Sequence, residues 1–395
     1  MSQTLETDRT TGTDGAVELH ERHLSVVVGG QNRRFHYVWL RDNSWAPQDR
    51  VFLSSERKAA TFDIRDDIAP LSARYDDRLG LVVDWNDGRS ASYSAEFLCR
   101  YDYSGAPRSA RRHAVRLWDE QPTILPRVAH ADVVATTEGQ LAYLDAVREY
   151  GAAVVTGVPS LDGEVERFAE TIGHVREVAF ERVHNVRHDP TGYNVAHTPG
   201  ELKPHADLPS YSWPPSVQLL HFLVNRADGG ESTLVDGWAC AHELRRVAPH
   251  HFDTLVRTPV PYQLFSADED TWAENPMIEL DTDGDIKVLR FSNQLAQPLS
   301  VPFDRVEAFY DAYRHLGRII DSGRFRHTFK CDDGDLVTVH SHRVLHGRLP
   351  YDPSSGARHL QDVYMEFDDL LARRRVLRGE HLPTAAQRPG NEETA

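Results

Sequence analysis

Three candidate metal ligands lie in two segments that are far apart in the sequence. His205 and Asp207 form a His-x-Asp motif around Ala206, and His346 follows far downstream. Residues 201–210 are expected to be extended. Because residues i and i+2 of a strand point the same way, His205 and Asp207 can reach one ion. Two imidazoles and one carboxylate are the ligand set of a non-haem iron(II) oxygenase, which leaves other coordination positions open. The fold must therefore bring these distant segments to one iron site.

Arg358 begins a second informative segment, residues 358–364. Its period-two alternation predicts a strand with four side chains on one face, namely Arg358, Leu360, Asp362 and Tyr364. An arginine buried in a barrel mouth needs an anion, and a guanidinium matches a carboxylate through two parallel hydrogen bonds. A dicarboxylate that chelates iron through its 2-oxo acid end needs such an anchor at its far end. The segment therefore predicts 2-oxoglutarate as the cosubstrate.

Several longer stretches carry a resemblance to a known family. Beyond the His346 and Arg358 segments, they are Tyr37-Val38-Trp39-Leu40-Arg41-Asp42-Asn43, Asn194-Val195-Ala196-His197-Thr198, Pro214-Pro215-Ser216-Val217-Gln218-Leu219-Leu220-His221 and Gly229-Gly230-Glu231-Ser232-Thr233-Leu234-Val235-Asp236-Gly237. With these stretches the chain resembles the gamma-butyrobetaine hydroxylase branch of the taurine dioxygenase superfamily, from about residue 17 to about residue 378. The resemblance implies an iron(II)- and 2-oxoglutarate-dependent dioxygenase. Such an enzyme uses O2 to oxidise, most simply to hydroxylate, a C–H bond of a small polar metabolite and releases succinate and CO2.

The resemblance also assigns roles to single residues. His205, Asp207 and His346 match the iron ligands, and Arg358 matches the partner of the distal 2-oxoglutarate carboxylate. Three further positions match the cosubstrate pocket: Ser232, whose hydroxyl in relatives lies beside that carboxylate, Asn194 and Leu220.

His340 and His342 are alternatives to His346, because they form a His-x-His pair that a strand could present to a metal. We favour His346, since Leu-His-Gly-Arg followed by an arginine at this distance is the family arrangement. His340 and His342 are then expected to pack beneath the site.

Two departures from the family pattern matter. Relatives often carry cysteines of a small zinc site directly after the Leu-Arg-Asp-Asn motif, but residues 44–48 contain none, and residues 89–93 supply no histidine. A tetrahedral zinc site without thiolates has no ligands here, so no structural zinc is predicted.

The second departure is the aromatic cage that holds a trimethylammonium group in relatives. The matching positions here are Phe180, His184, His197, Leu208 and Tyr364, and Ser292 is expected in the same substrate pocket. With two aromatic carbocycles left, a quaternary ammonium substrate is in doubt.

The composition restricts partners and compartment. With 60 acidic against 44 basic side chains the net charge is -16, which argues against nucleic acid or an anionic membrane as a partner. The three cysteines are widely separated and odd in number, so no disulfide framework is expected and a reducing cytoplasm fits best. The N-terminus has no apolar signal sequence, and no apolar run approaches the length of a bilayer. We expect a cytoplasmic enzyme with a small-molecule substrate. The resemblance further implies a homodimer, in which the N-terminal domain serves dimerisation or covers the neighbouring active site.

The pattern of residues predicts five regions. They are a disordered tail over 1–15, a small all-β domain over 16–103, a linker over 104–127, a catalytic domain over 128–380 and a disordered tail over 381–395. In the small domain the expected strands are residues 24–28, 35–39 and 81–85.

The catalytic domain combines many short strands with few helices. One helix is expected to begin with a capping box at Thr137 and Gln140 and to end at Gly151, and another begins near Val306. The expected strands are residues 152–156, 217–224, 286–291, 325–330, 336–339 and 358–367. This arrangement is typical of a mostly β fold with flanking helices, a double-stranded β-helix (jelly roll) whose mouth holds the metal. Residues 265–276 are expected to form a lid loop over it.

Three functions are compatible with these patterns. The first is hydroxylation of a small polar metabolite in the manner of gamma-butyrobetaine hydroxylase. The second keeps the cofactors but acts on an amino acid, a phosphonate or a specialised-metabolite intermediate, with desaturation or cyclisation as an outcome. The third is a jelly-roll binding protein without catalysis, which the three candidate ligands and Arg358 argue against.

Overall fold

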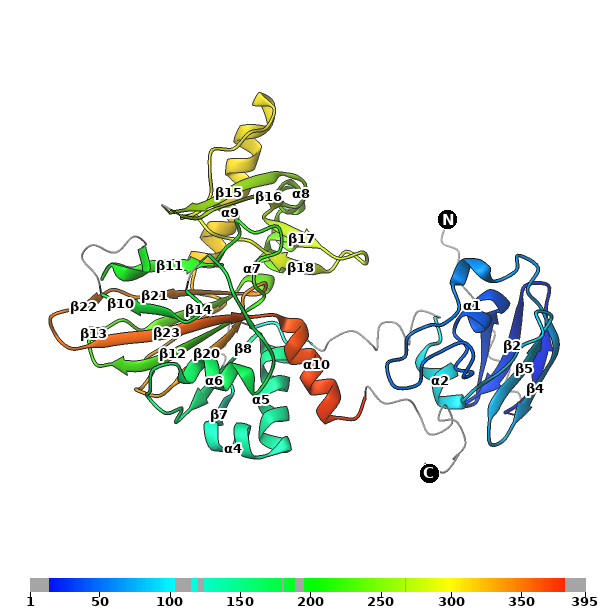
Figure 1. The fold of residues 1–395 in the computed structure, drawn as a ribbon. Coiled ribbons are helices and arrows are strands. Elements are labelled where there is room, and N and C mark those ends of the chain that lie inside the picture. Colours follow the sequence, from blue (N-terminus) through cyan, green and yellow to red (C-terminus); the bar gives the residue numbers. More distant parts are fainter. Residues whose placement is uncertain are drawn as a thin grey trace. The chain divides into compact units, whose positions relative to one another are not determined.

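The computed structural model describes residues 14–103, 115–119, 124–179, 181–188, 195–266 and 268–380. The chain divides into two compact units, whose described parts lie within residues 14–103 and residues 115–380 (Figure 1). Residues 1–13 of the expected N-terminal tail, the whole expected C-terminal tail and most of the expected linker lie outside the described residues. None of the helices in these ranges has the length and apolar character required to cross a membrane.

Two small antiparallel sheets form the first unit. Its elements are β1 (Val17–Leu19), β2 (His23–Val28), β3 (Gln31–His36), α1 (Tyr37–Asp42), the 3-10 helix η1 (Thr61–Asp63), β4 (Pro70–Asp76), β5 (Gly80–Trp85), β6 (Ser90–Tyr93) and α2 (Ala95–Arg100). The sheets have the orders β1-β2-β3 and β4-β5-β6, and side chains of both, such as Val26 and Val83, share one hydrophobic core.

The predicted strand over residues 35–39 is wrong from Tyr37 on, because β3 ends at His36 and α1 begins at Tyr37. Tyr37, Leu40 and Arg41 are the buried residues of this helix, and spacings of three and four residues place them on one helical face. The β-branched and aromatic residues favoured a strand, but burial of this face decides the local structure.

Arg41 is buried because acidic side chains surround it. Its Nη1 lies 3.2 Å from Asp49 Oδ2 and its Nε donates to Asp87 Oδ2 at 2.7 Å. Arg89 Nη1 completes the group at 2.6 Å from Asp49 Oδ1. We call these four residues the charge network of the first unit.

The second unit contains the larger sheets. Its strands are β7 (Arg127–Ala129), β8 (Ala152–Thr156), β9 (Val175–Arg176), β10 (His184–Arg187), β11 (Leu202–His205), β12 (Val217–Asn225), β13 (Asp228–Gly229), β14 (Ser232–Asp236), β15 (Pro259–Phe265), β16 (Asp270–Pro276), β17 (Ile278–Leu280), β18 (Ile286–Leu289), β19 (Arg326–Phe329), β20 (Leu336–His340), β21 (Val344–Arg348), β22 (Tyr351–Asp352) and β23 (Arg358–Met365). Its helices are α4 (His130–Ala135), α5 (Thr137–Tyr150), α6 (Glu164–Glu170), η2 (Val195–His197), α7 (Gly237–Val247), α8 (Pro249–Arg257), η3 (Phe303–Arg305), α9 (Val306–Asp321) and α10 (Phe367–Leu377).

The two main sheets pack face to face. One has the order β10-β23-β12-β20-β8-β7, with β9 beside β23, and the other has the order β11-β21-β14-β19. A shared core between them contains Phe222 and Leu360 of the first sheet and Leu234 and Val344 of the second. The predicted jelly roll with a mostly β fold is confirmed.

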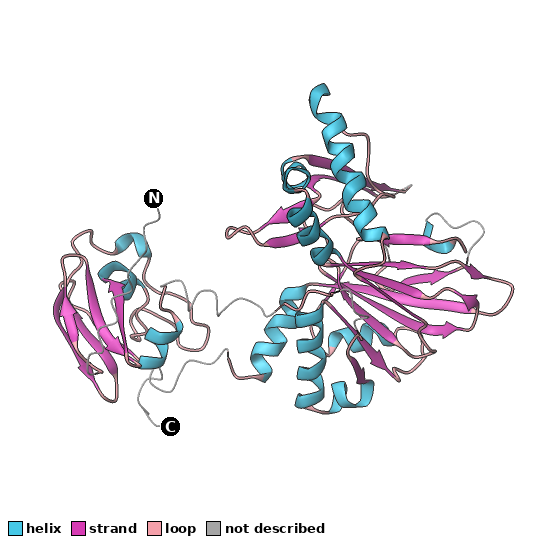
Figure 2. Cartoon of the chain, turned by 180° about the vertical axis from the view of Figure 1, so that it is seen from behind, coloured by secondary structure: helices cyan, strands magenta, loops and turns pink. Residues whose placement is uncertain are grey.

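Helices cover the outer faces of both sheets (Figures 1 and 2). Residues of α4, α5, α6 and α10 pack on the outward side chains of the larger sheet, such as Val217 and Val363. Residues of α7, α8 and α9 pack on Val235 and Leu345 of the smaller sheet. Strand alternation therefore turns the neighbours Gln218, Asp362 and His346 toward the space between the sheets.

Most predicted elements of this unit are present, with small shifts at their ends. The N-cap of α5 is Thr136, whose hydroxyl accepts from the backbone N–H of Gly139, and not Thr137 as predicted. Gly151 ends α5 with a φ of 78°, as expected for a C-terminal glycine. Within the expected linker, Trp118 is buried in the second unit and its indole N–H donates to the carbonyl of Tyr150.

The predicted lid loop over residues 265–276 is wrong. Asp270–Pro276 is strand β16, which pairs with β15 in a hairpin. Polar residues and a proline favoured a loop, but cross-strand pairing determines the conformation. The hairpin still reaches the candidate site, because Leu264 of β15 lines its cavity.

Candidate metal and cosubstrate site

Strand pairing brings the three predicted metal ligands together. His205 at the end of β11 lies opposite His346 of β21, and Asp207 follows two residues later. His205 Nε2 lies 3.1 Å from Asp207 Oδ1, and His346 Nε2 lies 3.7 Å from Asp207 Oδ2. The candidate ligand atoms of all three lie within 4.8 Å of one another, and no other such group occurs among the described residues.

The local geometry differs from the extended segment expected over residues 201–210. The strand ends at His205, and the backbone N–H of Ala206 donates to the carbonyl of Phe291. Leu208 then takes a φ of 53°, which is rare for a branched residue, and its side chain is buried. Such backbone conformations persist where the surroundings impose them, often at functional sites. Asp207 thus reaches His205 from a turn and not from a strand.

The protonation preferences of these groups suit a divalent cation. Burial lowers the pKa of His346 to about 4. Burial would raise the pKa of Asp207, but His346 and His205 outweigh it and the pKa is lowered. Burial alone would lower the pKa of His205. The hydrogen bond and negative charge of Asp207 outweigh burial, so the pKa of His205 is raised. A carboxylate and neutral imidazoles are the forms that bind metals. The negative charge of Asp207 favours the protonated form of His205, and a bound metal cation would displace that proton.

Neighbouring groups orient two of the ligands. If the Nδ1 of His205 carries the proton, it donates to the carbonyl of Lys203 at 2.9 Å and leaves Nε2 as the acceptor. Asp207 Oδ2 accepts from the Tyr364 hydroxyl at 2.8 Å and from Gln218 Nε2 at 3.0 Å. The other carboxylate oxygen, Asp207 Oδ1, faces His205 and can coordinate a metal ion. The donor set therefore fits one iron(II) ion.

Arg358 lies in the same cavity and has no anionic partner in the part of the chain that the structure describes. Its guanidinium lies over the rings of Phe222 and Tyr351, at 5.9 and 5.3 Å, but among the described residues it forms no ion pair and its buried Nε has no hydrogen-bond partner. Burial, followed by the charge of Arg348, lowers the pKa of Arg358 to about 10. A buried cation without a counter-ion is costly, so the cavity fits an anionic ligand at this end.

The cavity unites most of the predicted site residues. Its volume is about 290 Å³, and its walls include the three candidate metal ligands, Arg358 and six of the other predicted residues, namely Ser232, Leu220, His184, Leu208, Tyr364 and Ser292. Asn194 and Phe180 lie outside the described residues. His197 is buried behind the wall, with its ring 5.9 Å from that of His184.

Sequence reasoning missed three polar residues of the cavity wall. Gln218 holds Asp207, and Asp362 pairs with His184, whose Nδ1 lies 2.9 Å from Asp362 Oδ1. Arg348 donates to the carbonyls of Ala196, Thr198 and Gly200 and so fixes one wall. The alternation of residues 358–364 placed Asp362 on the correct face, but its partners come from distant strands.

His340 and His342 lie away from the metal ligands. The ring of His340 stacks on Phe367 at 4.0 Å, and His342 Nε2 lies 2.9 Å from the carbonyl of Pro214. Neither lines the cavity, so the choice of His346 agrees with the geometry.

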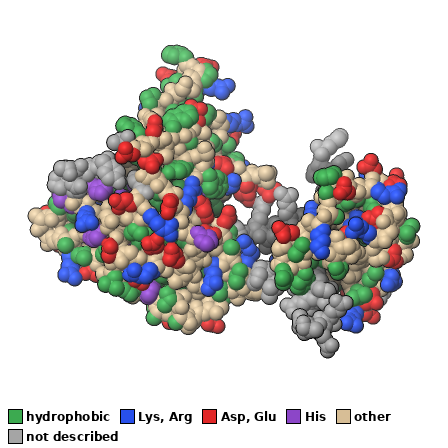
Figure 3. Space-filling view, viewed as in Figure 1, with side chains coloured by type: hydrophobic (Ala, Val, Ile, Leu, Met, Phe, Trp, Pro, Cys, Tyr) green, Lys and Arg blue, Asp and Glu red, His purple; other side chains and the backbone are tan. Residues whose placement is uncertain are grey.

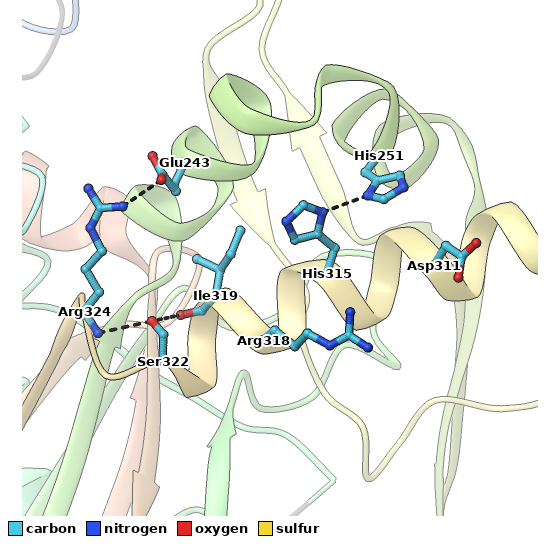
Figure 4. A pocket seen from close by; sticks show the side chains of 8 residues that line it. All are labelled: Glu243, His251, Asp311, His315, Arg318, Ile319, Ser322 and Arg324. Atoms are coloured by element: carbon cyan, nitrogen blue, oxygen red, sulfur yellow. Dashed lines mark hydrogen bonds and ion pairs between the residues drawn. The ribbon is translucent and has the colours of Figure 1, made fainter.

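A second hollow, about 510 Å³ in volume, lies between α7, α8 and α9 (Figure 4). His251 and His315 face each other there, with 2.9 Å between their Nδ1 atoms, and Arg324 pairs with Glu243. It contains no group of three metal ligands within the described residues. The hollow is therefore not the predicted site.

Comparison with known proteins gives the family. The family model described as "Taurine catabolism dioxygenase TauD, TfdA family" matches residues 125–364. A gamma-butyrobetaine dioxygenase of Pseudomonas sp. (strain AK-1) is 34% identical over 351 residues, which cover 88% of this chain and 91% of that protein. The chain belongs to this family. The predicted family and enzyme class are confirmed, and the protein is an iron(II)- and 2-oxoglutarate-dependent dioxygenase.

More distant matches have varied names. The human mitochondrial trimethyllysine dioxygenase is 28% identical over 376 residues, which cover 92% of this chain and 87% of that protein. The solved structure of the non-heme iron oxygenase OrfP in complex with Fe and alpha-ketoglutaric acid aligns with a TM-score of 0.46 at 18% identity, covering 64% of this chain and 87% of that chain. The two dioxygenases matched by sequence are named for different substrates, so the substrate of this chain must be argued from its own cavity.

Proposed function

We propose that His205, Asp207 and His346 hold the iron(II) ion and that Arg358 binds the distal carboxylate of 2-oxoglutarate, with the hydroxyl of Ser232 beside it. The single observation that carries this proposal is that the Arg358 guanidinium lies in the same cavity as the three ligands and has no ion pair among the described residues. A guanidinium forms two parallel hydrogen bonds to a carboxylate, which would neutralise the buried charge.

When bound, iron and 2-oxoglutarate supply the oxidation of a substrate C–H bond by O2, with release of succinate and CO2. The side chains position these groups. Tyr364 and Gln218 hold Asp207 in one orientation. Leu220 and Leu360 are apolar parts of the cavity wall, and Leu264 of the β15–β16 hairpin helps to exclude water from the cavity.

The substrate in this proposal is a small polar metabolite, and hydroxylation is the simplest outcome. The named relatives act on gamma-butyrobetaine and trimethyllysine, which are trimethylammonium compounds. At the matching cage positions this chain has His184, His197 and Leu208, and the Tyr364 hydroxyl is bound to Asp207. An amino acid or another polar metabolite, with desaturation or cyclisation as an outcome, is the second candidate, because the cage is altered.

The test is succinate formation. The purified protein would be incubated with iron(II), 2-oxoglutarate and a library of amines, betaines, amino acids, sulfonates and phosphonates. We expect succinate in excess over the substrate-free reaction with at least one compound and none with His205→Ala. Arg314→Ala, a change in an exposed ion pair on α9, serves as the control. Full turnover by His205→Ala would refute the iron site.

A cytoplasmic location, a homodimer and the absence of structural zinc stay predictions. All three cysteines are unpaired, which suits a reducing compartment such as the cytoplasm. On the face drawn in Figure 3, acidic and basic side chains are interspersed over the second unit. Such a mixed surface gives no support to a polyanionic partner. Sedimentation would test the homodimer, and metal analysis of iron-free protein would test the absence of zinc.

A further inference from the structure

A buried carboxylate lines the same cavity, next to the candidate metal ligand Asp207 through the shared donor Gln218. Asp362 is 1% exposed and lines the cavity wall. Its Oδ1 faces His184 Nδ1 at 2.9 Å, and its Oδ2 accepts from Gln218 Nε2 at 2.8 Å. Among the described residues no lysine or arginine lies within ion-pair distance of it. A buried carboxylate normally has a cationic partner, and here the described residues supply an imidazole but no lysine or arginine.

The amide of Gln218 adds a second acceptor. Its Nε2 lies within hydrogen-bond distance of Asp207, Asp362 and the Tyr364 hydroxyl. Carboxylates only accept, so the NH2 group must face them and the amide orientation is fixed. The carbonyl Oε1 is buried without a hydrogen-bond donor in the described structure. The wall therefore presents one acceptor without a donor, Gln218 Oε1, beside the carboxylate of Asp362, whose partners among the described residues are an imidazole and an amide but no lysine or arginine.

We propose that the substrate carries a cationic group with N–H donors, such as a protonated amine or a guanidinium, and that Asp362 binds this group with the help of Gln218. The proposal rests on the proposed function, because it concerns the substrate of the same site. A quaternary ammonium has no N–H to donate to a carboxylate. It also needs aromatic faces, and of the five matching cage positions Phe180 and Tyr364 alone carry aromatic carbocycles. A charge-assisted hydrogen bond to Asp362 replaces ring contacts as the basis of recognition.

Matched pairs of compounds test this proposal directly. The iron(II)-loaded enzyme with 2-oxoglutarate would be assayed for substrate-dependent succinate with gamma-aminobutyrate against gamma-butyrobetaine, lysine against trimethyllysine, and 4-guanidinobutyrate. We expect a kcat/KM at least tenfold higher for the N–H member of a pair. Equal or better turnover of the trimethylated members would overturn the proposal, and so would a lack of response to every N–H cation in the series. Iron binding and substrate-free 2-oxoglutarate turnover, measured first, report on the proposed function separately.

A charge-removing variant tests the role of Asp362. Asp362→Asn keeps the shape of the side chain, and we expect roughly a 10- to 100-fold loss in kcat/KM for the N–H substrate with unchanged iron content and 2-oxoglutarate affinity. Asp311→Asn, at an exposed ion pair on α9 that Figure 4 places at the second hollow, is the matched control. Unchanged kcat/KM in Asp362→Asn would overturn the proposal. A loss of 2-oxoglutarate affinity in the same proportion would also overturn it, by showing a structural role.

Discussion

The two units bury arginine side chains in different ways. In the first unit, Arg41 has opposite charges on two sides, Asp49 and Asp87, so its charge is balanced by the polypeptide itself. In the catalytic cavity, Arg358 is surrounded by rings and by a second guanidinium, with no carboxylate partner among the described residues. A buried charge that serves stability has its partner built in, whereas one that serves binding leaves the position open for a ligand.

Removing each arginine should therefore have opposite effects on stability. Arg41→Met leaves buried acidic groups without their cation and should cost about 3–5 kcal/mol of the stability of the first unit. Arg358→Met removes an uncompensated charge, so the second unit should keep or gain stability. Denaturant-dependent amide hydrogen exchange on the full chain measures the free energy of unfolding of each unit separately. Equal destabilisation by both variants would contradict the view that Arg41 stabilises its unit whereas Arg358 does not.

The same Arg358→Met change should weaken cosubstrate binding. Loss of the charge-assisted hydrogen bonds predicts a roughly 10- to 100-fold higher Kd for 2-oxoglutarate, with iron content unchanged. Calorimetric titration under anaerobic conditions measures this. Arg343→Met is the contrasting control, because Arg343 pairs with Asp236 outside the cavity and should affect stability but not cosubstrate affinity.

Removing the hydrogen bond from Tyr364 to Asp207 should have a smaller effect, on the affinity for iron. Tyr364→Phe keeps the ring but removes one of the two donors that hold Oδ2. Changes in groups that orient metal ligands typically cost 10- to 100-fold in metal affinity, and we expect roughly tenfold here because Gln218 still donates. Competition with a metal chelator measures the affinity. An unchanged value would show that the hydroxyl serves only the substrate.

His342 should produce the smallest effect, on the acid stability of the protein. Burial lowers its pKa to about 4, below the value of about 6.5 expected for an unfolded chain. The unfolded state therefore binds the proton first, and the free energy of unfolding falls as the pH drops through this window. His342→Asn retains a donor for the carbonyl of Pro214, and we expect it to recover about 1–2 kcal/mol of the loss between pH 6.5 and pH 5. Urea unfolding at both pH values tests this, and an unchanged slope would contradict it.

Residue type and spacing predicted four side chains that the structure brings into one cavity. His205, Asp207, His346 and Arg358 carry chemistry that few other patterns explain, and strand alternation placed Arg358 on the correct face. The helix at Tyr37 was not predictable, because the burial of Arg41 depends on Asp49 and Asp87 elsewhere in the chain.

The polar wall of the cavity was also beyond sequence reasoning. Asp362 meets His184 and Gln218 only because β10, β12 and β23 are neighbours in one sheet. The β15–β16 hairpin was missed for a similar reason, since cross-strand pairing outweighs the loop-like composition of residues 265–276. Local patterns specify which face a side chain takes, and tertiary pairing specifies its partner.

The most direct test is an anaerobic titration of the iron(II)-loaded protein with 2-oxoglutarate, followed by the visible charge-transfer absorption of the iron complex. If the three side chains bind one iron ion that faces Arg358, the absorption should appear and saturate in the wild type and be absent in Asp207→Ala and His346→Ala. No absorption in the wild type, or the same absorption in either variant, would contradict a shared iron site at these residues.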